Sequence, residues 1–163
     1  TYLKIISAKT AALFAAAAES GAVIAQTDGL REASLKSYGN NLGIAFQLVD
    51  DALDYSGREA MMGKAVGDDF SEGKLTLPVI FALSHANGEE AEFWRRTMAQ
   101  RQQSDADLTH AIHLIEKHHA IAATLNRART FTDEACRALN VFPDSPMRRA
   151  LTDLAEFCVS RAY

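Results

Sequence analysis

Apolar residues recur at three- and four-residue steps along most of this chain, and no segment alternates apolar with polar residues as a strand does. Twenty-nine of the 163 residues are alanine, the residue that loses least on entering a helix. Only three prolines interrupt the pattern. The sequence therefore predicts an all-α fold, one continuous bundle of helices without a sheet.

Glycine, proline and capping residues divide this pattern into separate helices. We expect helices over residues 2–26, 30–55, 77–85, 88–103, 105–118, 119–140 and 146–162. In the first of them, Gly21 and the alanines at 15–18 are small enough to let a neighbouring helix come close. Residues 57–76 lack clear periodicity and contain four glycines, and a loop of this length inside a domain is usually functional or disordered.

The charge balance excludes some classes of partner. Seventeen basic against 21 acidic residues give a net charge of −4, which argues against binding to nucleic acid or anionic lipid but leaves room for a small anionic ligand. No apolar run approaches the ~20 residues that span a bilayer. Cys136 and Cys158 make neither a disulfide framework nor a zinc site, and we expect reduced thiols in a cytoplasmic protein.

The most informative short stretch is residues 46–54, Phe-Gln-Leu-Val-Asp-Asp-Ala-Leu-Asp. Helical steps of three and four place an amide and three carboxylates in one stripe, from Gln47, Asp50, Asp51 and Asp54. Like charges at this spacing repel, and burial increases the cost. Mg²⁺ would relieve the repulsion, because it takes oxygen ligands and commonly combines one or two carboxylates with substrate phosphates. The alternative is an ordinary solvated helix face.

Two lysines and several glycines follow this acidic stripe. Lys64 and Lys74 supply point charges suited to phosphate oxygens, and the glycines let the backbone approach a ligand. The residue order is not that of a Walker loop, and an ordinary surface loop remains the alternative. In the first helix, Lys9 and Thr10 interrupt an apolar pattern, where a lone lysine more often extends to solvent.

Together these stretches resemble the second half of a trans-prenyl diphosphate synthase. Lys9-Thr10-Ala11 resembles the Lys-Thr motif of that family, residues 46–54 resemble its second aspartate-rich motif, and residues 63–78 resemble the signature that follows. The match runs from residue 1 to about residue 85. Lys-Thr-Ala followed by Leu13-Phe14 looks more like the long-chain octaprenyl and decaprenyl synthases than like the farnesyl enzymes.

The resemblance implies an antiparallel helical bundle of the isoprenoid synthase type that is incomplete here. Residues 1–163 would be the C-terminal half of a single all-helical domain, since the first aspartate-rich motif and the basic residues for isopentenyl diphosphate would lie upstream. The chain begins without methionine or a signal peptide, which fits a fragment. The family is usually dimeric, so we expect a homodimer.

The resemblance also implies a reaction: Mg²⁺-dependent, head-to-tail condensation of isopentenyl diphosphate with an allylic diphosphate. The product would be a polyprenyl diphosphate, for quinone side chains, and the fragment alone would be inactive. Asp50 and Asp54 would hold Mg²⁺, with Asp51 as a further ligand or acting through hydrogen bonds. Diphosphate would be bound by Lys9, Lys64 and Lys74, while Thr10 and Gln47 would turn oxygen dipoles toward the allylic cation.

This reaction requires no histidine base, because the released diphosphate takes the proton. We expect the four histidines at 110, 113, 118 and 119 to be exposed on helix faces rather than to bind a metal. Two other functions remain open. A non-catalytic helical subunit would be expected to lose the aspartates, and a terpene cyclase of the same fold would mix Asn, Ser/Thr and Glu in its second metal motif.

Overall fold

The structure of the protein is a computed structural model that describes residues 1–56 and 66–162. These two ranges contain helices and turns and no strand, which confirms the predicted all-α class. The chain divides into two compact units: unit one is Thr1–Val49 with Asn126–Tyr163, and unit two is Asp50–Leu125. The assignment of the whole chain to a single domain stays a prediction. In the described ranges, no helix has the length and apolar content needed to cross a membrane.

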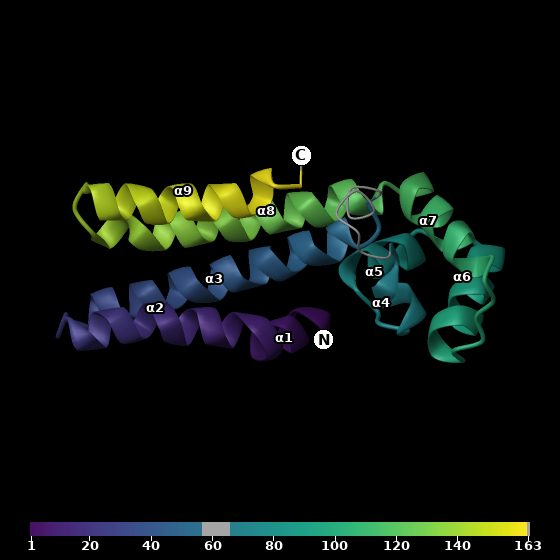
Figure 1. Ribbon diagram of the computed structural model, residues 1–163, viewed down its shortest axis with the longest axis horizontal. Helices are drawn as coiled ribbons and strands as arrows, with labels where there is room; N and C mark the ends of the chain where they lie inside the picture. The colour runs from purple at the N-terminus through teal and green to yellow at the C-terminus, as the bar shows by residue number, and fades with distance from the viewer. Residues whose placement is uncertain (57–65, 163) are drawn as a thin grey trace. The chain divides into compact units, whose positions relative to one another are not determined.

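Unit one is built from long helices that run lengthwise beside one another. In chain order they are α1 (Tyr2–Ile6), η1 (Ser7–Ala11), α2 (Ala12–Ile24), most of α3 (Gly29–Leu53), most of α8 (Ala120–Ala138), η4 (Leu139–Val141) and α9 (Pro146–Ser160). Figure 1 shows α2 and α3 as one antiparallel pair and α8 and α9 as another. The predicted antiparallel packing is therefore present in this unit.

Two glycines of α3 allow the first helices to pack closely against it. A Cβ atom on Gly39 would lie 2.3 Å from the carbonyl oxygen of Phe14, and one on Gly43 would lie 2.6 Å from the Cα of Ala11. By contrast, nothing lies within 4 Å of a Cβ built on Gly21. The role predicted for Gly21 is therefore wrong, because the close approach occurs nearer the middle of the helix pair.

The core of unit one joins α3 to α8 and α9. Tyr38 and Leu42 pack with Leu139, Ala155 and Cys158. The Tyr38 hydroxyl donates a hydrogen bond to the carbonyl oxygen of Leu151 at 2.8 Å, which satisfies its polar end inside the apolar cluster. Cys136 and Cys158 form no disulfide in the described residues, and Cys158 is buried while Cys136 is half-buried.

Unit two consists of shorter helices around a separate core. They are the end of α3, α4 (Asp68–Ser71), α5 (Leu77–Ser84), α6 (Gly88–Trp94), η3 (Arg95–Ala99), α7 (Asp107–Lys117) and the start of α8. Trp94 is at the centre of this core, with its ring 6.5 Å from that of Phe70 and 5.1 Å from that of Phe93, both edge-on. Tyr55, Val79 and Ile115 belong to the same cluster.

The structure corrects the predicted helices in three places. Within residues 57–76, expected to lack regular structure, α4 forms a short helix that begins after Gly67, whose φ is +82°. The first and fourth expected helices also contain π-helical segments, η1 and η3. In η1 the N–H of Ala12 donates to the carbonyl oxygen of Ser7, five residues earlier. Such an insertion of one residue in a turn leaves no mark in the apolar pattern, so the periodicity could not indicate it.

Candidate functional site

The acidic stripe lies at the C-terminal end of α3, and its three aspartates belong to unit two. Asp51 and Asp54 are 3% and 8% exposed, and Asp50 is half-buried. Val49 and Leu53 are buried among apolar residues, as expected. Two of the three carboxylates are therefore removed from bulk water, which does not fit the alternative of a solvated helix face and makes their mutual repulsion more costly.

Asp54 ties the end of α3 to the start of α4. Its backbone carbonyl accepts a hydrogen bond from the N–H of Gly67 at 2.9 Å, and its Oδ2 accepts one from the N–H of Asp69 at 3.1 Å. Gly67 adopts a left-handed conformation, and a Cβ there would lie 2.2 Å from the Cδ1 of Leu108. Glycine is thus required at the turn that brings the second acidic segment to the first.

Lys74 lies next to this second acidic segment. Its Nζ forms ion pairs with Glu72 at 2.7 Å and with Asp69 at 3.0 Å. These two contacts, the one to Glu72 first, raise the pKa of the Lys74 ammonium above its ordinary value, so the group stays charged at neutral pH. Asp69 therefore links two of the predicted site residues in unit two: its N–H binds the carboxylate of Asp54, and its own carboxylate binds Lys74.

Two buried residues with hydroxyl groups lie next to these motifs in the sequence, and the sequence analysis missed both. Tyr55 follows Asp54 directly and is 2% exposed, and Thr76 is 6% exposed. Burial is the main cause that raises the pKa of the Tyr55 hydroxyl, and the charges of Asp54, Asp69 and Asp51 raise it further. Their position beside the two motifs was the available signal, but neither side chain carries a charge that marks it as a ligand.

The predicted site residues of unit one form a second group. The Thr10 hydroxyl donates to the Oε1 of Gln47 at 2.8 Å, although the two residues are 37 positions apart. Lys9 and Thr10 lie in η1, and π-helical segments often occur at functional sites because they turn side chains away from the regular helical register. Phe46, the residue before Gln47, packs its ring 5.6 Å from that of Phe14, and the Arg161 guanidinium lies 4.4 Å above it.

The predicted residues therefore divide between the two units. Thr10 and Gln47 meet in unit one, where Lys9 is exposed. The carboxylates of α3 and Lys74 belong to unit two. Lys64 lies outside the described residues, so the structure does not address its predicted role.

The carboxylates fit Mg²⁺ only as a partial ligand set. Among the described residues, no group of three or more His, Cys, Asp or Glu side chains is arranged to hold a metal ion. Asp50 and Asp54 are one helical turn apart and offer hard oxygen ligands. Mg²⁺ commonly takes its remaining ligands from water and substrate phosphates, so two carboxylates of this stripe fit a site that is completed by diphosphate.

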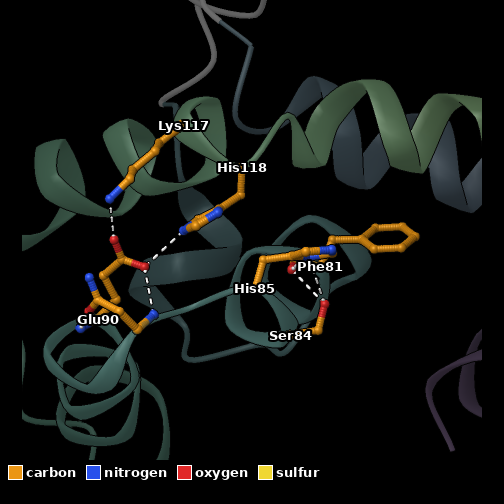
Figure 2. A network of polar contacts seen from close by, with 7 residues as sticks. Phe81, Ser84, His85, Glu90, Lys117 and His118 are labelled. Atoms are coloured by element: carbon orange, nitrogen blue, oxygen red, sulfur yellow. Dashed lines mark hydrogen bonds and ion pairs between the residues drawn. The ribbon is translucent and has the colours of Figure 1, made fainter.

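One of the four histidines expected to be exposed differs from expectation. His110, His113 and His119 are exposed, as predicted, but His118 is largely buried. Figure 2 shows His118 and Lys117 both reaching the carboxylate of Glu90, with the His118 Nε2 2.8 Å from it. His118 also stacks on His85, with ring centroids 6.2 Å apart. A buried glutamate 28 positions away, which the helical pattern does not reveal, explains the burial of His118.

Comparison with known proteins agrees with the motifs. The family model for polyprenyl synthetases matches residues 1–115. The chain belongs to the polyprenyl synthetase family. It is 38% identical over 162 residues to the octaprenyl diphosphate synthase of Haemophilus influenzae, covering 99% of this chain and 49% of that protein.

Two solved structures of this family are similar along nearly the whole chain. A decaprenyl diphosphate synthase from Rhodobacter capsulatus is 48% identical with a TM-score of 0.92, over 99% of this chain and 50% of the other. A polyprenyl synthase from Caulobacter crescentus, complexed with calcium and isoprenyl diphosphate, is 51% identical with a TM-score of 0.93, over 99% of this chain and 49% of the other. The chain thus has the isoprenoid synthase fold and spans about half the length of these relatives.

Proposed function

We propose that this chain is the C-terminal half of a polyprenyl diphosphate synthase, which condenses isopentenyl diphosphate head to tail with an allylic diphosphate. The observation that carries the proposal is the link from the buried Asp54 carboxylate, directly after α3, through Asp69 to Lys74. The carboxylates proposed to accept a divalent cation and the positively charged Lys74 belong to one unit of a chain from the polyprenyl synthetase family, which supports the proposal. A relative that holds calcium and isoprenyl diphosphate supports the same ligand classes.

Asp50 and Asp54 are the residues that would hold Mg²⁺. Bound there, the ion would polarise the oxygens of the allylic diphosphate and so stabilise the leaving group. Asp51, the most deeply buried of the three, would contribute either as a ligand or through hydrogen bonds that orient its neighbours. The buried surroundings strengthen each of these interactions, because less water screens them.

The lysines would act on the departing diphosphate, and the oxygen dipoles would act on the allylic cation. The C–O bond to the diphosphate breaks, the electron pair leaves with the diphosphate, and Lys74, Lys9 and Lys64 neutralise its growing charge. Thr10 and Gln47 face the allylic cation with oxygen atoms that do not trap it covalently. The double bond of isopentenyl diphosphate then attacks the cation, and the released diphosphate accepts the proton that is lost.

Several finer points belong to the same proposal. The product is a long polyprenyl diphosphate, used for quinone side chains, in line with the octaprenyl and decaprenyl synthases to which the chain is similar. The enzyme works in the cytoplasm as a homodimer. The chain by itself binds diphosphate with Mg²⁺ but completes no condensation, because a half-length synthase lacks the site for the second substrate.

Calorimetric titration of the chain with inorganic diphosphate, with and without Mg²⁺, tests this function. We expect binding that requires Mg²⁺ and that falls at least tenfold in Asp50→Asn. Asp153→Asn, a change of an exposed aspartate on α9, is the control and should bind normally. A condensation assay with labelled isopentenyl diphosphate should show product only when the chain is supplied with the complementary half of a relative such as the Rhodobacter capsulatus enzyme. Absence of Mg²⁺-dependent binding would contradict the proposal.

A further inference from the structure

The outer face of α2 does not have the composition of a surface that meets water. Ala11 and Ala15 lie against Gly43 and Gly39 of α3 and are buried. The positions on the opposite side of the helix are exposed, and two of them carry large apolar side chains that are 75% and 81% exposed. We call this surface the α2 outer face; it consists of Leu13, Ala17, Ser20 and Ile24.

This face lacks the charged residues that cover the other long helices of unit one. Of the 13 residues of α2, all of them described, Glu19 alone is charged, and Lys36 of α3 pairs with its carboxylate at 2.9 Å. By contrast, the exposed residues of α8 include Arg127, Arg129, Asp133, Glu134 and Arg137. Helix α9 exposes apolar side chains too, but Arg149, Asp153 and Glu156 stand among them. A helix that is largely apolar on all sides is normally buried, so the α2 outer face requires a cover.

A groove beside the outer face offers further apolar surface. Its volume is about 680 Å³, and small side chains of η1 and α2 line much of it, among them Ala8, Ala12 and Ala16. Ile44 of α3 and Phe131 of α8 add larger apolar side chains, and the lining also includes two lysines and the paired glutamate of α2. Small side chains let the backbone of a partner helix come close, because the distance between packed helices depends on the residues at the contact. The groove and the outer face together therefore suit a helix laid along α2.

The lengths of the relatives indicate what covers this surface. The two solved relatives align with 99% of this chain, but the chain covers only about half of each. The remaining half of each relative is part of the same polypeptide, and it gains stability by burying its apolar surface against this half. Such burial requires a face without unpaired charges, which the α2 outer face provides.

We propose that the α2 outer face is the surface on which the complementary half of the synthase packs, through an apolar face of one of its own helices. This inference rests on the proposed function, because it takes the chain to be one half of such an enzyme. Ala17 is at the centre of the contact, and Leu13 and Ile24 insert between side chains of the partner helix. Helix α2 is then enclosed by α3 on one side and by the complementary half on the other.

Co-expression of the chain with the tagged complementary half of the Rhodobacter capsulatus enzyme tests this inference. We expect the unsubstituted chain to co-purify with that half in equal amounts. Ala17→Glu should lower the recovered amount at least tenfold, because it buries a charge without a partner. The matched control is Ala33→Glu, which changes an exposed alanine of α3 one helical turn from the exposed Lys36 and should co-purify normally. Circular dichroism should show the same helical content for the free chain and both variants, since both alanines are exposed.

A second variant of the same face, Ile24→Glu, should also lose co-purification. The inference is overturned if the unsubstituted chain does not co-purify, or if both Ala17→Glu and Ile24→Glu co-purify normally. Calorimetry of the free chain with magnesium diphosphate is independent of this result. A chain that co-purifies but binds no magnesium diphosphate would contradict the proposed diphosphate site and leave the packing surface in place.

Two other occupants of the α2 outer face are outcomes of the same series. If light scattering shows a dimer of the chain that persists when the complementary half is supplied, and Ala17→Glu makes it monomeric, the occupant is a second copy. If the chain sediments with vesicles of phosphatidylcholine and phosphatidylglycerol, and Ala17→Glu abolishes this sedimentation, the occupant is a membrane. Either result would overturn the inference.

Discussion

Unit two contains two buried carboxylates that are each connected to a lysine, Glu90 directly and Asp54 through Asp69. Glu90 accepts from the Asn87 N–H in a capping box at the start of α6 and also binds Lys117 and His118 (Figure 2). Asp54 accepts from the N–H of Asp69, and its link to Lys74 runs through that second carboxylate.

The direct contacts of Glu90 favour a role in the fold, and the position of Asp54 fits the proposed role in binding a ligand. Around Glu90, one negative charge meets two side chains that carry or accept a positive charge, with a polar contact for each oxygen. Asp54 binds the N–H of Asp69, and the Asp69 carboxylate in turn pairs with Lys74. Aspartates at this helical spacing offer hard oxygen ligands for a cation that diphosphate would complete, whereas the Glu90 carboxylate already binds Lys117 and His118.

The largest expected effect comes from Asp50→Ala. In a full-length synthase formed with the complementary half, this change should lower turnover by roughly three or more orders of magnitude, because it removes a ligand of the cation that stabilises the leaving group. Circular dichroism should show the same helical content and a similar unfolding temperature, because Asp50 is half-buried and leaves no cavity in the core. Near-normal turnover would refute the role of the acidic stripe.

Glu90→Gln, the corresponding change in the other region, should lower the stability of the fold and leave ligand binding unchanged. We expect the unfolding temperature to fall by roughly 5 °C, since Lys117 and His118 lose a buried ionic partner. Binding of magnesium diphosphate should not change. Glu89→Gln, at the exposed neighbouring position, is the control and should leave the unfolding temperature within about 1 °C. If Glu90→Gln weakened the binding of magnesium diphosphate as much as Asp50→Ala does, the two regions would not differ in function.

The pH dependence of stability should report the Glu90 region. Lys117 and then His118 lower the pKa of Glu90 from 4.5 to about 2. A group whose pKa is lower in the folded state contributes stability that is complete above the unfolded value and is lost as the pH falls toward the folded one. The gap in unfolding temperature between the unsubstituted protein and Glu90→Gln should therefore be constant from pH 7 to about 5 and shrink from about pH 4.5 to 2. A gap independent of pH would contradict this assignment.

The fold and the acidic stripe could be predicted because both depend on short spacings. The apolar steps of α3 and the positions of Asp50, Asp51 and Asp54 are read within two helical turns, and the structure confirms the helix and the burial of Val49 and Leu53. The pairing of Thr10 with Gln47 spans 37 positions, and only the family resemblance indicated that both belong to a site.

The features that were missed depend on what a residue meets after folding. Gly39 and Gly43 are needed because η1 and α2 come within contact of α3, and no pattern within α3 itself shows this. His118 is buried because Glu90 arrives from another helix. Tyr55 and Thr76 carry no charge that marks them, so their burial beside the two motifs became visible only in three dimensions.

The smallest expected effects come from the lysines of the two regions and give the finest comparison. Lys74 and Lys117 are similarly exposed, at 44% and 49%, but their partners differ: Asp69 is 17% exposed and Glu72 61%, whereas Glu90 is 8% exposed. Partly exposed ion pairs contribute little because water and salt screen them, so Lys74→Met should change the unfolding temperature by no more than about 1 °C. Lys117→Met should lower it by more, because a better-buried carboxylate loses its partner. Diphosphate binding should follow the reverse order, with the loss in Lys74→Met. A calorimetric titration and a melting curve of each variant would measure the affinity for diphosphate and the unfolding temperature. If one of the two lysine substitutions changed both quantities or neither, the two regions would not differ in the way their geometry indicates.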